Sequence, residues 1–295
     1  MKMADVPHST RFVLWRRLGE TAAFQWKQFL RRAPESRITF CIAHFNSPDF
    51  LEINLQAIRR FYPDAHIIVS DALSAWSEYC AAKAVSVRYG AVMHPLVGRY
   101  RHTGLLNYMF RKVRTPIAVF FDQDCMLLDR LDDLFQSIKD GRALIGPSDN
   151  MPLTHPNYYL SFPSANRQLR SAPHFVHASF MIVDVPRVRA WSNNRPFHWH
   201  KKWGAHPLER YYGITQLVRL KQADAIQLLD SYHTGYGLGM VYVHAGRPIA
   251  YHNWYSGRIF GQQGNIDSFD IAWLQQETAR FLRDHSQNKL NLKRS

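Results

Sequence analysis

The stretch TPIAVFFDQDCML, residues 115–127, is the most informative about the architecture of this chain. Its first seven residues are almost all apolar, which is typical of a strand that is buried on both faces of a parallel sheet. The apolar run stops at Asp122, and Asp124 follows after one residue. Because alternate residues of an extended chain point to the same side, the two carboxylates are expected to lie close together. Two like charges beside a core repel each other and require a compensating partner.

A divalent cation would supply that partner. Carboxylate oxygens are hard ligands, which favours Mn²⁺ or Mg²⁺, and such ions keep positions for water and phosphate oxygens. The alternative is that Asp122 caps the following turn while Asp124 is solvated. The apolar strand before the motif and the pattern upstream of it favour the metal interpretation.

Strands and helices alternate upstream of this motif. Strands are predicted at 37–45 and 65–72, with a third, shorter one at AVSVRY, residues 84–89. Helices are predicted at 47–62, where Pro48 suits the first turn, and at 103–113. This order predicts an α/β fold with right-handed crossovers and a mostly parallel, Rossmann-like sheet.

The second half mixes strands with long loops. Its predicted strands are residues 141–148, 177–185, 225–230, 240–244 and 248–252. Aromatic and turn-forming residues fill 149–176, and we expect substrate specificity to reside there and around 191–208, since loops of this length are usually functional. Helices are predicted at 207–220 and 267–287.

Composition limits the class of partner. The 295 residues allow one large domain or two small ones, and 37 basic against 23 acidic residues give a net charge of +14. This excess favours nucleic acid, an acidic lipid surface or a phosphorylated small molecule. Within the N-terminal segment 1–36, residues 11–32 predict an amphipathic helix that either lies on an anionic membrane or packs on its own domain.

Cysteine usage and hydropathy indicate a location. The three cysteines are widely spread, so neither a disulfide framework nor a zinc site is expected. No apolar run approaches the roughly 20 residues that a membrane span needs. We therefore expect a cytoplasmic protein, or one at the inner face of a membrane.

The order ITFCIAHFNSPDFLEINLQAI, HIIVSDALS and GLLNYMFRKVRTPIAVFFDQDCML resembles the nucleotide-binding half of inverting glycosyltransferases of family 2, which have the GT-A fold. His44-Phe45-Asn46 stands where that family has a Tyr-Asn-like loop. Ser70-Asp71 matches its acidic strand end, and Leu105-Leu106-Asn107 matches its Ala-Leu-Asn-like element. The resemblance covers roughly residues 37–130, and PLERYYGITQLVRL and AYHNWYSG extend it loosely.

The resemblance implies a catalytic domain at 37–262, with a nucleotide-sugar half at 37–130 and an acceptor half at 131–262, followed by a C-terminal helix within 263–295. It implies transfer of a sugar from a nucleotide-diphospho-sugar to a saccharide, lipid-linked or protein acceptor. The implied metal ligands are Asp122, Asp124 and His252. The implied donor-binding residues are Asn46, Asp71, Arg101, Asn107, Asp122 and Arg258.

The implied catalytic base is Glu209, which here precedes Arg210 where many relatives have two acids. Asp184 and Asp230, both at strand ends, are reserve candidates. Three alternatives stay open at this point. Asp71 could simply form a turn, Arg101 could be a solvated loop residue, and His252 could be structural.

Two other functions fit parts of the pattern. A phosphohydrolase could use an aspartate of this motif as its nucleophile, although no convincing second acidic pair follows downstream. A basic nucleic-acid-binding protein would suit the net charge. The positive charges are nevertheless spread along the chain without a known binding motif, so nucleic acid is not the expected partner.

Overall fold

The computed structural model describes residues 36–72, 74–96, 102–147, 176, 179–192, 196–197, 225–233, 239–252, 280 and 283. The predicted helices at 11–32 and 207–220 lie outside these residues. So do the predicted C-terminal helix and the loop at 149–176, except for Val176, Arg280 and Arg283.

The strands of the described residues form one mixed sheet in the order β3-β2-β1-β4-β7-β6-β8-β9-β10-β5. The first group along the chain is β1 (Ile38–His44), β2 (His66–Asp71), β3 (Val92–Pro95), β4 (Ile117–Asp122) and β5 (Cys125–Leu127). The second group is β6 (Leu144–Pro147), β7 (Phe180–Asp184), β8 (Ile226–His233), β9 (Met240–His244) and β10 (Arg247–His252).

Strand direction divides the sheet into two parts. β3, β2, β1 and β4 are mutually parallel, as the strand–helix order predicted. β7 then runs antiparallel to both β4 and β6, and β8, β9, β10 and β5 pair antiparallel in turn. The predicted mixed α/β sheet with a parallel core is therefore confirmed.

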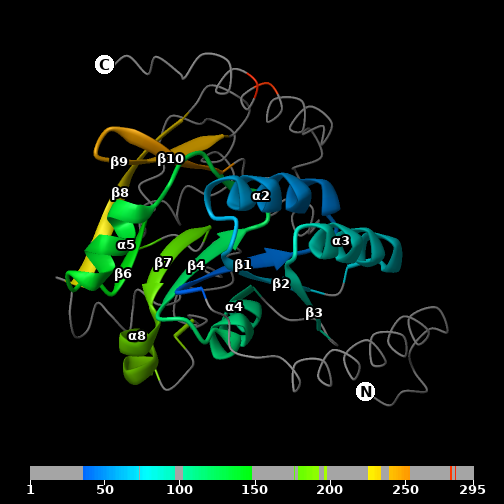
Figure 1. The fold of residues 1–295 in the computed structure, drawn as a ribbon, viewed down its shortest axis with the longest axis horizontal. Coiled ribbons are helices and arrows are strands. Elements are labelled where there is room, and N and C mark those ends of the chain that lie inside the picture. The colour runs from blue at the N-terminus through cyan, green and yellow to red at the C-terminus, as the bar shows by residue number, and fades with distance from the viewer. Residues whose placement is uncertain are drawn as a thin grey trace, which may run out of the picture.

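Helices cover both faces of the sheet (Figure 1). On one face α2 (Pro48–Phe61), α3 (Trp76–Arg88) and α5 (Asp132–Lys139) pack in one hydrophobic cluster with the sheet. On the other face α4 (His102–Lys112) and α8 (Val185–Ser192) pack in a second cluster. Helix α2 shows why: Leu51, Leu55 and Ile58 recur at helical spacing and are buried.

One predicted strand is wrong. Residues 84–88 of the predicted AVSVRY strand belong to α3, and the edge strand is β3, which starts only at Val92. The buried residues Tyr79, Ala82 and Ser86 lie on one face of α3 at helical spacing. Val87 favoured the strand prediction because it is β-branched, but it is 70% exposed on the solvent side of the helix.

A topological switch point lies between β1 and β4. The chain leaves β1 through α2 on one face of the sheet, whereas it enters β4 from α4 on the opposite face. Ligands of open α/β sheets bind outside the carboxyl ends of the strands at such a point. These ends are His44 of β1 and Asp122 of β4, and Asp71 of β2 lies beside His44.

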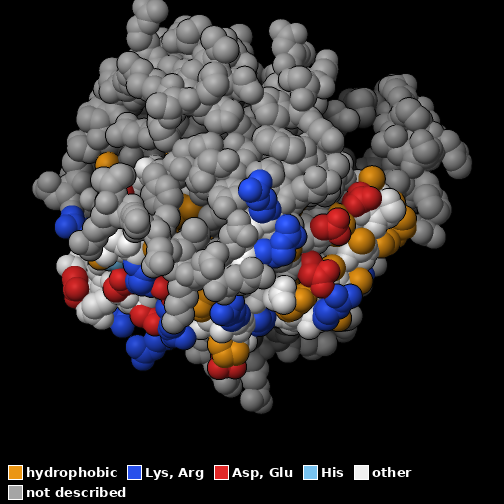
Figure 2. Space-filling model, turned by 90° about the horizontal axis from the view of Figure 1, so that it is seen from above, with side chains coloured by type: hydrophobic (Ala, Val, Ile, Leu, Met, Phe, Trp, Pro, Cys, Tyr) orange, Lys and Arg blue, Asp and Glu red, His pale blue; other side chains and the backbone are white. Residues whose placement is uncertain are grey.

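The surface provides two further facts. On the face shown in Figure 2, acidic and basic side chains of the described residues are interspersed, so these residues do not form a single-sign basic patch there. Among the described helices, none is long and apolar enough to cross a membrane.

Candidate functional site

Asp122, Asp124 and His252 come together at the switch point. Each offers one ligand atom, and these atoms all lie within 4.8 Å of one another. The His252 Nε2 atom is 3.4 Å from Asp124 Oδ1. The residues are 7%, 0% and 2% exposed in the order Asp122, Asp124 and His252, so little water compensates their charge. The structure thus places together the three residues that the resemblance implied as metal ligands.

Strand register explains how His252 reaches the two aspartates from far along the chain. Asp122 ends β4, Gln123 and Asp124 form a turn, and β5 starts at Cys125. β10 pairs antiparallel with β5, and His252 is the register partner of Cys125. The end of β10 therefore lies directly beside the turn that carries Asp124.

Asn54 of α2 holds this turn in place. Its Nδ2 donates hydrogen bonds to the carbonyl oxygens of Cys125, at 2.6 Å, and of Asp122, at 3.4 Å. The Asp122 N–H donates to the Ser179 carbonyl at 3.0 Å. The backbone on both sides of Asp124 is consequently fixed by groups from α2 and from the residue before β7.

Gln123 joins the turn to the loop that follows β1. Its Oε1 accepts from the Phe45 N–H at 2.6 Å, and its Nε2 donates to the Phe45 carbonyl at 2.9 Å. One buried side-chain amide thereby satisfies both backbone polar groups of Phe45. This pair of bonds bridges the switch point itself, because Phe45 follows β1 and Gln123 follows β4.

The potential at the site is negative. Burial, followed by the charges of Asp124 and Asp122, raises the pKa of Cys125 well above its ordinary value. Burial likewise raises the pKa of Tyr242, and the same two carboxylates add to the effect. Two carboxylate oxygens and one imidazole nitrogen in this potential form a donor set that fits a divalent cation.

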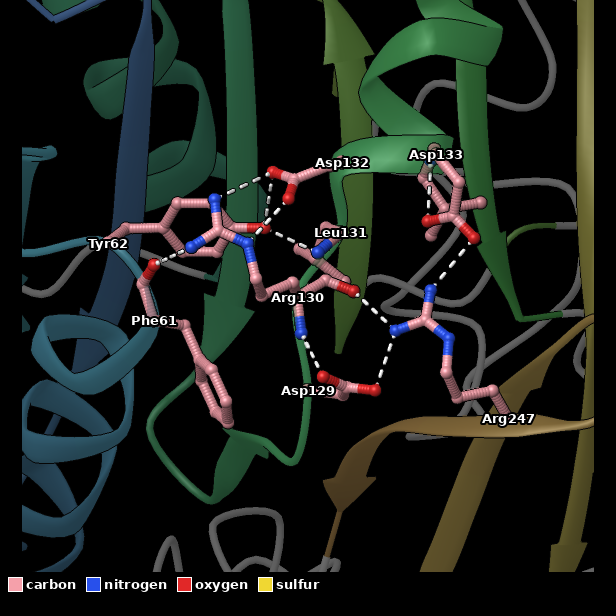
Figure 3. Close-up of polar contacts among 9 residues, drawn as sticks. Phe61, Tyr62, Asp129, Arg130, Leu131, Asp132, Asp133 and Arg247 are labelled. Atoms are coloured by element: carbon pink, nitrogen blue, oxygen red, sulfur yellow. Dashed lines mark hydrogen bonds and ion pairs between the residues drawn. The ribbon is translucent and has the colours of Figure 1, made fainter.

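The far end of β10 is anchored by ionic contacts (Figure 3). The Arg247 guanidinium donates to Asp129 Oδ2 at 2.7 Å, to the Arg130 carbonyl at 2.9 Å and to Asp133 Oδ2 at 2.8 Å. Burial alone would raise the pKa of Asp133, but the bond and charge of Arg247 hold it below its ordinary value. Arg247 thus fixes the start of the strand that ends in His252.

Asp71 and Asn46 build the loops beyond β1 and β2. Asp71 is fully buried; its Oδ1 accepts from His44 Nδ1 at 2.9 Å and from the Ser74 hydroxyl, and its Oδ2 accepts from the Ser74 N–H at 3.1 Å. Asn46 has a positive φ of 48°, and its Oδ1 accepts from the Ala75 N–H at 2.7 Å. Asp71 ends β2 and Asn46 follows the end of β1, and both residues shape the backbone there.

The other implied site residues have varied positions. Asn107 uses both amide atoms on the backbone of Phe197, donating at 2.5 Å and accepting at 3.0 Å. Arg101, Glu209 and Arg258 lie outside the described residues. We expected Asp184 to be a reserve base, but it pairs with Ile117 at the opposite end of β4 from Asp122 and accepts from the Arg187 N–H of α8.

The sequence analysis did not predict two residues that form a chain of polar contacts with His252. Tyr242 Oη lies 2.9 Å from His252 Nδ1, and Ser179 Oγ lies 2.7 Å from Tyr242 Oη. Neither residue belongs to a motif with the aspartates. Only the alternation of MVYVH, which places Tyr242 and Met240 on one face of β9, hinted that Tyr242 points inward.

Neither a protein family model nor a curated protein sequence matches this chain. Similar solved structures include the mannosyltransferase PcManGT from Pyrobaculum calidifontis in complex with GDP-Man and Mn²⁺, at 15% identity and a TM-score of 0.40, covering 78% of this chain and 70% of that one. S. aureus TarS 1–349 matches at 13% identity and a TM-score of 0.46, covering 88% and 76%. The glycosyltransferase GlyE of Streptococcus pneumoniae matches at 10% identity and 0.44, covering 66% of this chain and 46% of GlyE.

PcManGT is a mannosyltransferase and GlyE is a glycosyltransferase, but all three TM-scores are below 0.5. The fold class is therefore stated from the structure itself: a mixed α/β sheet with a parallel core, flanked by helices. A buried Asp-Asp-His group lies at its switch point.

Proposed function

We propose that this chain is a metal-dependent glycosyltransferase that moves a sugar from a nucleotide-diphospho-sugar to an acceptor hydroxyl. The observation that supports this most directly is the Asp122–Asp124–His252 group at the carboxyl ends of the central strands. A nucleotide fold with a hard-cation site at its switch point suits a ligand that carries a diphosphate. Inversion at the sugar carbon is part of the proposal and rests on the sequence resemblance.

The donor set favours Mn²⁺ over Mg²⁺ as the resident ion. Mg²⁺ prefers an all-oxygen shell, whereas the third donor here is the Nε2 atom of His252. When bound, the cation would act as a Lewis acid that neutralises charge on the departing nucleoside diphosphate. Asp122, Asp124 and His252 would hold it, and the bonds from Asn54 and Gln123 keep the aspartates' turn in place.

The nucleoside would lie over the ends of β1 and β2, beside Asp71 and Asn46. Because the Asp71 carboxylate is buried and already bonded to His44 and Ser74, we assign it chiefly the task of shaping that surface. Asn107 receives a similar positioning role through Phe197. Arg101 and Arg258 remain the proposed phosphate contacts, since guanidinium groups suit phosphate oxygens.

Glu209 remains the proposed base, which would accept the proton of the acceptor hydroxyl. A well-placed base contributes about 10²–10⁴-fold to the rate. Glu209→Gln should therefore keep donor binding and lose turnover by about this factor. Normal sugar transfer by that variant would show that another group takes the proton.

A screen of nucleotide-sugars tests the proposal. The measurement is release of nucleoside diphosphate by the full chain, with Mn²⁺ and then with EDTA. Asp124→Ala should abolish the metal-dependent release, whereas Asp140→Ala, which removes an exposed carboxylate at the end of α5, should not. Turnover that persists in EDTA and in Asp124→Ala would refute the proposal, and a trapped aspartyl-phosphate would indicate a phosphohydrolase instead.

The acceptor is proposed only as a class: a saccharide, lipid-linked or protein hydroxyl. Residues 11–32, which would make peripheral contact with an anionic membrane, lie outside the described residues. Binding of the full chain to vesicles with and without anionic lipid measures that contact directly.

A further inference from the structure

Ser179 connects two of the three proposed ligands, although they come from opposite parts of the sheet. Its carbonyl oxygen accepts the Asp122 N–H at 3.0 Å. Its Oγ lies 2.7 Å from Tyr242 Oη, which in turn lies 2.9 Å from His252 Nδ1. The backbone of Ser179, just before β7, therefore contacts Asp122 at the end of β4. Its side chain contacts Tyr242 of β9, which in turn contacts His252 at the end of β10.

The whole chain of contacts is buried. Ser179, Tyr242 and His252 are each at most 2% exposed, so water cannot replace a lost partner. The Tyr242 ring is further fixed because it packs on the Phe180 ring, with centroids 6.1 Å apart. A buried polar atom without a partner is costly, so which atom donates in each of these hydrogen bonds affects the stability of the site.

The two nitrogens of His252 have different surroundings. Nε2 faces Asp124 Oδ1 at 3.4 Å, and Nδ1 faces the Tyr242 hydroxyl. A neutral imidazole can ligate a metal through Nε2 only if its proton is on Nδ1. With the proton there, Nδ1–H donates to Tyr242 Oη, and the Tyr242 hydroxyl is left to donate to Ser179 Oγ.

We propose that Tyr242, supported by Ser179, is a positioning residue that keeps the His252 proton on Nδ1 and so presents Nε2 as a metal ligand. Without the Tyr242 oxygen, a proton on Nδ1 would be buried with no acceptor from this residue. The alternative tautomer, with Nε2–H directed at Asp124, would then be favoured and would oppose metal binding. This inference rests on the proposed metal site, and it concerns residues that do not themselves touch the ion.

The test is a titration of the full chain with Mn²⁺ alone, with free Mn²⁺ followed by electron paramagnetic resonance. Partners that orient a metal-binding histidine typically change metal affinity by 10–100-fold, and we expect Tyr242→Phe to weaken Mn²⁺ binding by about that factor. Ser179→Ala, which keeps the backbone bond to Asp122, should cause a smaller loss. Tyr62→Phe is the matched control, because Tyr62 is also buried and its hydroxyl bonds Leu131 and Asp132 away from the site (Figure 3).

A double-mutant cycle separates positioning from a general structural effect. In a His252→Ala background, Tyr242→Phe should cause no further loss of Mn²⁺ affinity, because its effect passes through the imidazole. An equal loss in both backgrounds, or wild-type affinity in Tyr242→Phe, would overturn this inference while leaving the metal site intact. If the wild-type chain binds no Mn²⁺, or if the Asp124→Ala variant binds Mn²⁺ with the same affinity as the wild type, the proposed metal site itself is wrong.

Discussion

Replacing Asp124 by asparagine should reverse the order of stability between variant and wild type when Mn²⁺ is added. The substitution would keep the shape of the side chain and remove one of two buried negative charges. Without metal, the variant should unfold at a higher denaturant concentration than the wild type. With saturating Mn²⁺ the wild type should become the more stable, because only it retains the complete donor set.

The magnitude follows from the separation of the ligand atoms. The ligand atoms lie within 4.8 Å of one another, and two unit charges at that separation repel by about 3.5 kcal/mol at an effective dielectric constant of 20, which gives the order of magnitude of the repulsion between Asp122 and Asp124. Buried charges in proteins are partly compensated by their surroundings, so we expect a smaller gain of about 1–2 kcal/mol for Asp124→Asn without metal. A free Mn²⁺ concentration 100 times the dissociation constant should stabilise the wild type by about 2.7 kcal/mol.

The assay is urea unfolding at pH 8, where an ordinary histidine is neutral, in EDTA and in Mn²⁺. Asp140→Asn is the control, since this exposed carboxylate at the end of α5 should change stability by less than about 0.5 kcal/mol in both conditions. If Asp124→Asn is less stable than wild type in EDTA and gains as much from Mn²⁺, the two carboxylates neither repel as argued nor bind the ion.

Other contacts yield predictions that unfolding experiments can check. Gln123→Ala removes two part-buried hydrogen bonds between a buried amide and the loop after β1, and it should cost about 1–3 kcal/mol. Gln136→Ala, which removes one exposed hydrogen bond, should cost less than about 0.5 kcal/mol, and equal costs would contradict the role of the buried amide. Because the folded-state pKa of Asp133 is lowered, its stabilising pairing with Arg247 is fully present above the unfolded pKa and is lost as the pH falls through the folded value. The stability difference between wild type and Arg247→Met, at most about 1 kcal/mol for these partly exposed groups, should therefore close in acid, and a difference that widens there would refute this. Gly239→Ala would force a Cβ into the ring of Tyr251, a buried residue of β10, and should destabilise the fold by about 1–3 kcal/mol, so an unchanged urea midpoint would show that the ring can move.

Hydrophobic periodicity predicted the parallel half of the sheet because its signals are local. An apolar pattern with its own start and stop residues marks each of five elements, and the patterns agree with the burial of their residues: β1, α2, β2, α4 and β4. The strand prediction at residues 84–88 was wrong, because the exposed Val87 makes the solvent side of α3 look apolar in the sequence. Periodicity also missed α5 and the three-residue β5, which are too short to show a period of their own.

The residues of the candidate site could be predicted from the sequence only where their contacts join residues close together along the chain. Asp122 and Asp124 are two residues apart after a buried strand, so alternation alone brings them together. His252 was reached only through the family resemblance, because nothing in its immediate sequence specifies pairing with β5. The contact between Ser179 and Tyr242 could not be predicted from the sequence, since it spans 63 residues and depends on how β7 and β9 are placed in the sheet.

The dependence of His252 on sheet register links metal binding to docking of the β8–β9–β10 meander. Only the pairing of β10 with β5 brings the imidazole beside Asp124, and Arg247 at the other end of the same strand anchors that pairing to Asp129 and Asp133. A cation that binds all three ligands must therefore favour the docked strand over any arrangement in which β10 is detached. By thermodynamic reciprocity, docking of β10 strengthens cation binding by the same factor by which the cation strengthens docking. The salt bridges of Arg247 would thus support the proposed metal site by holding β10 in place, although none of their atoms belongs to it.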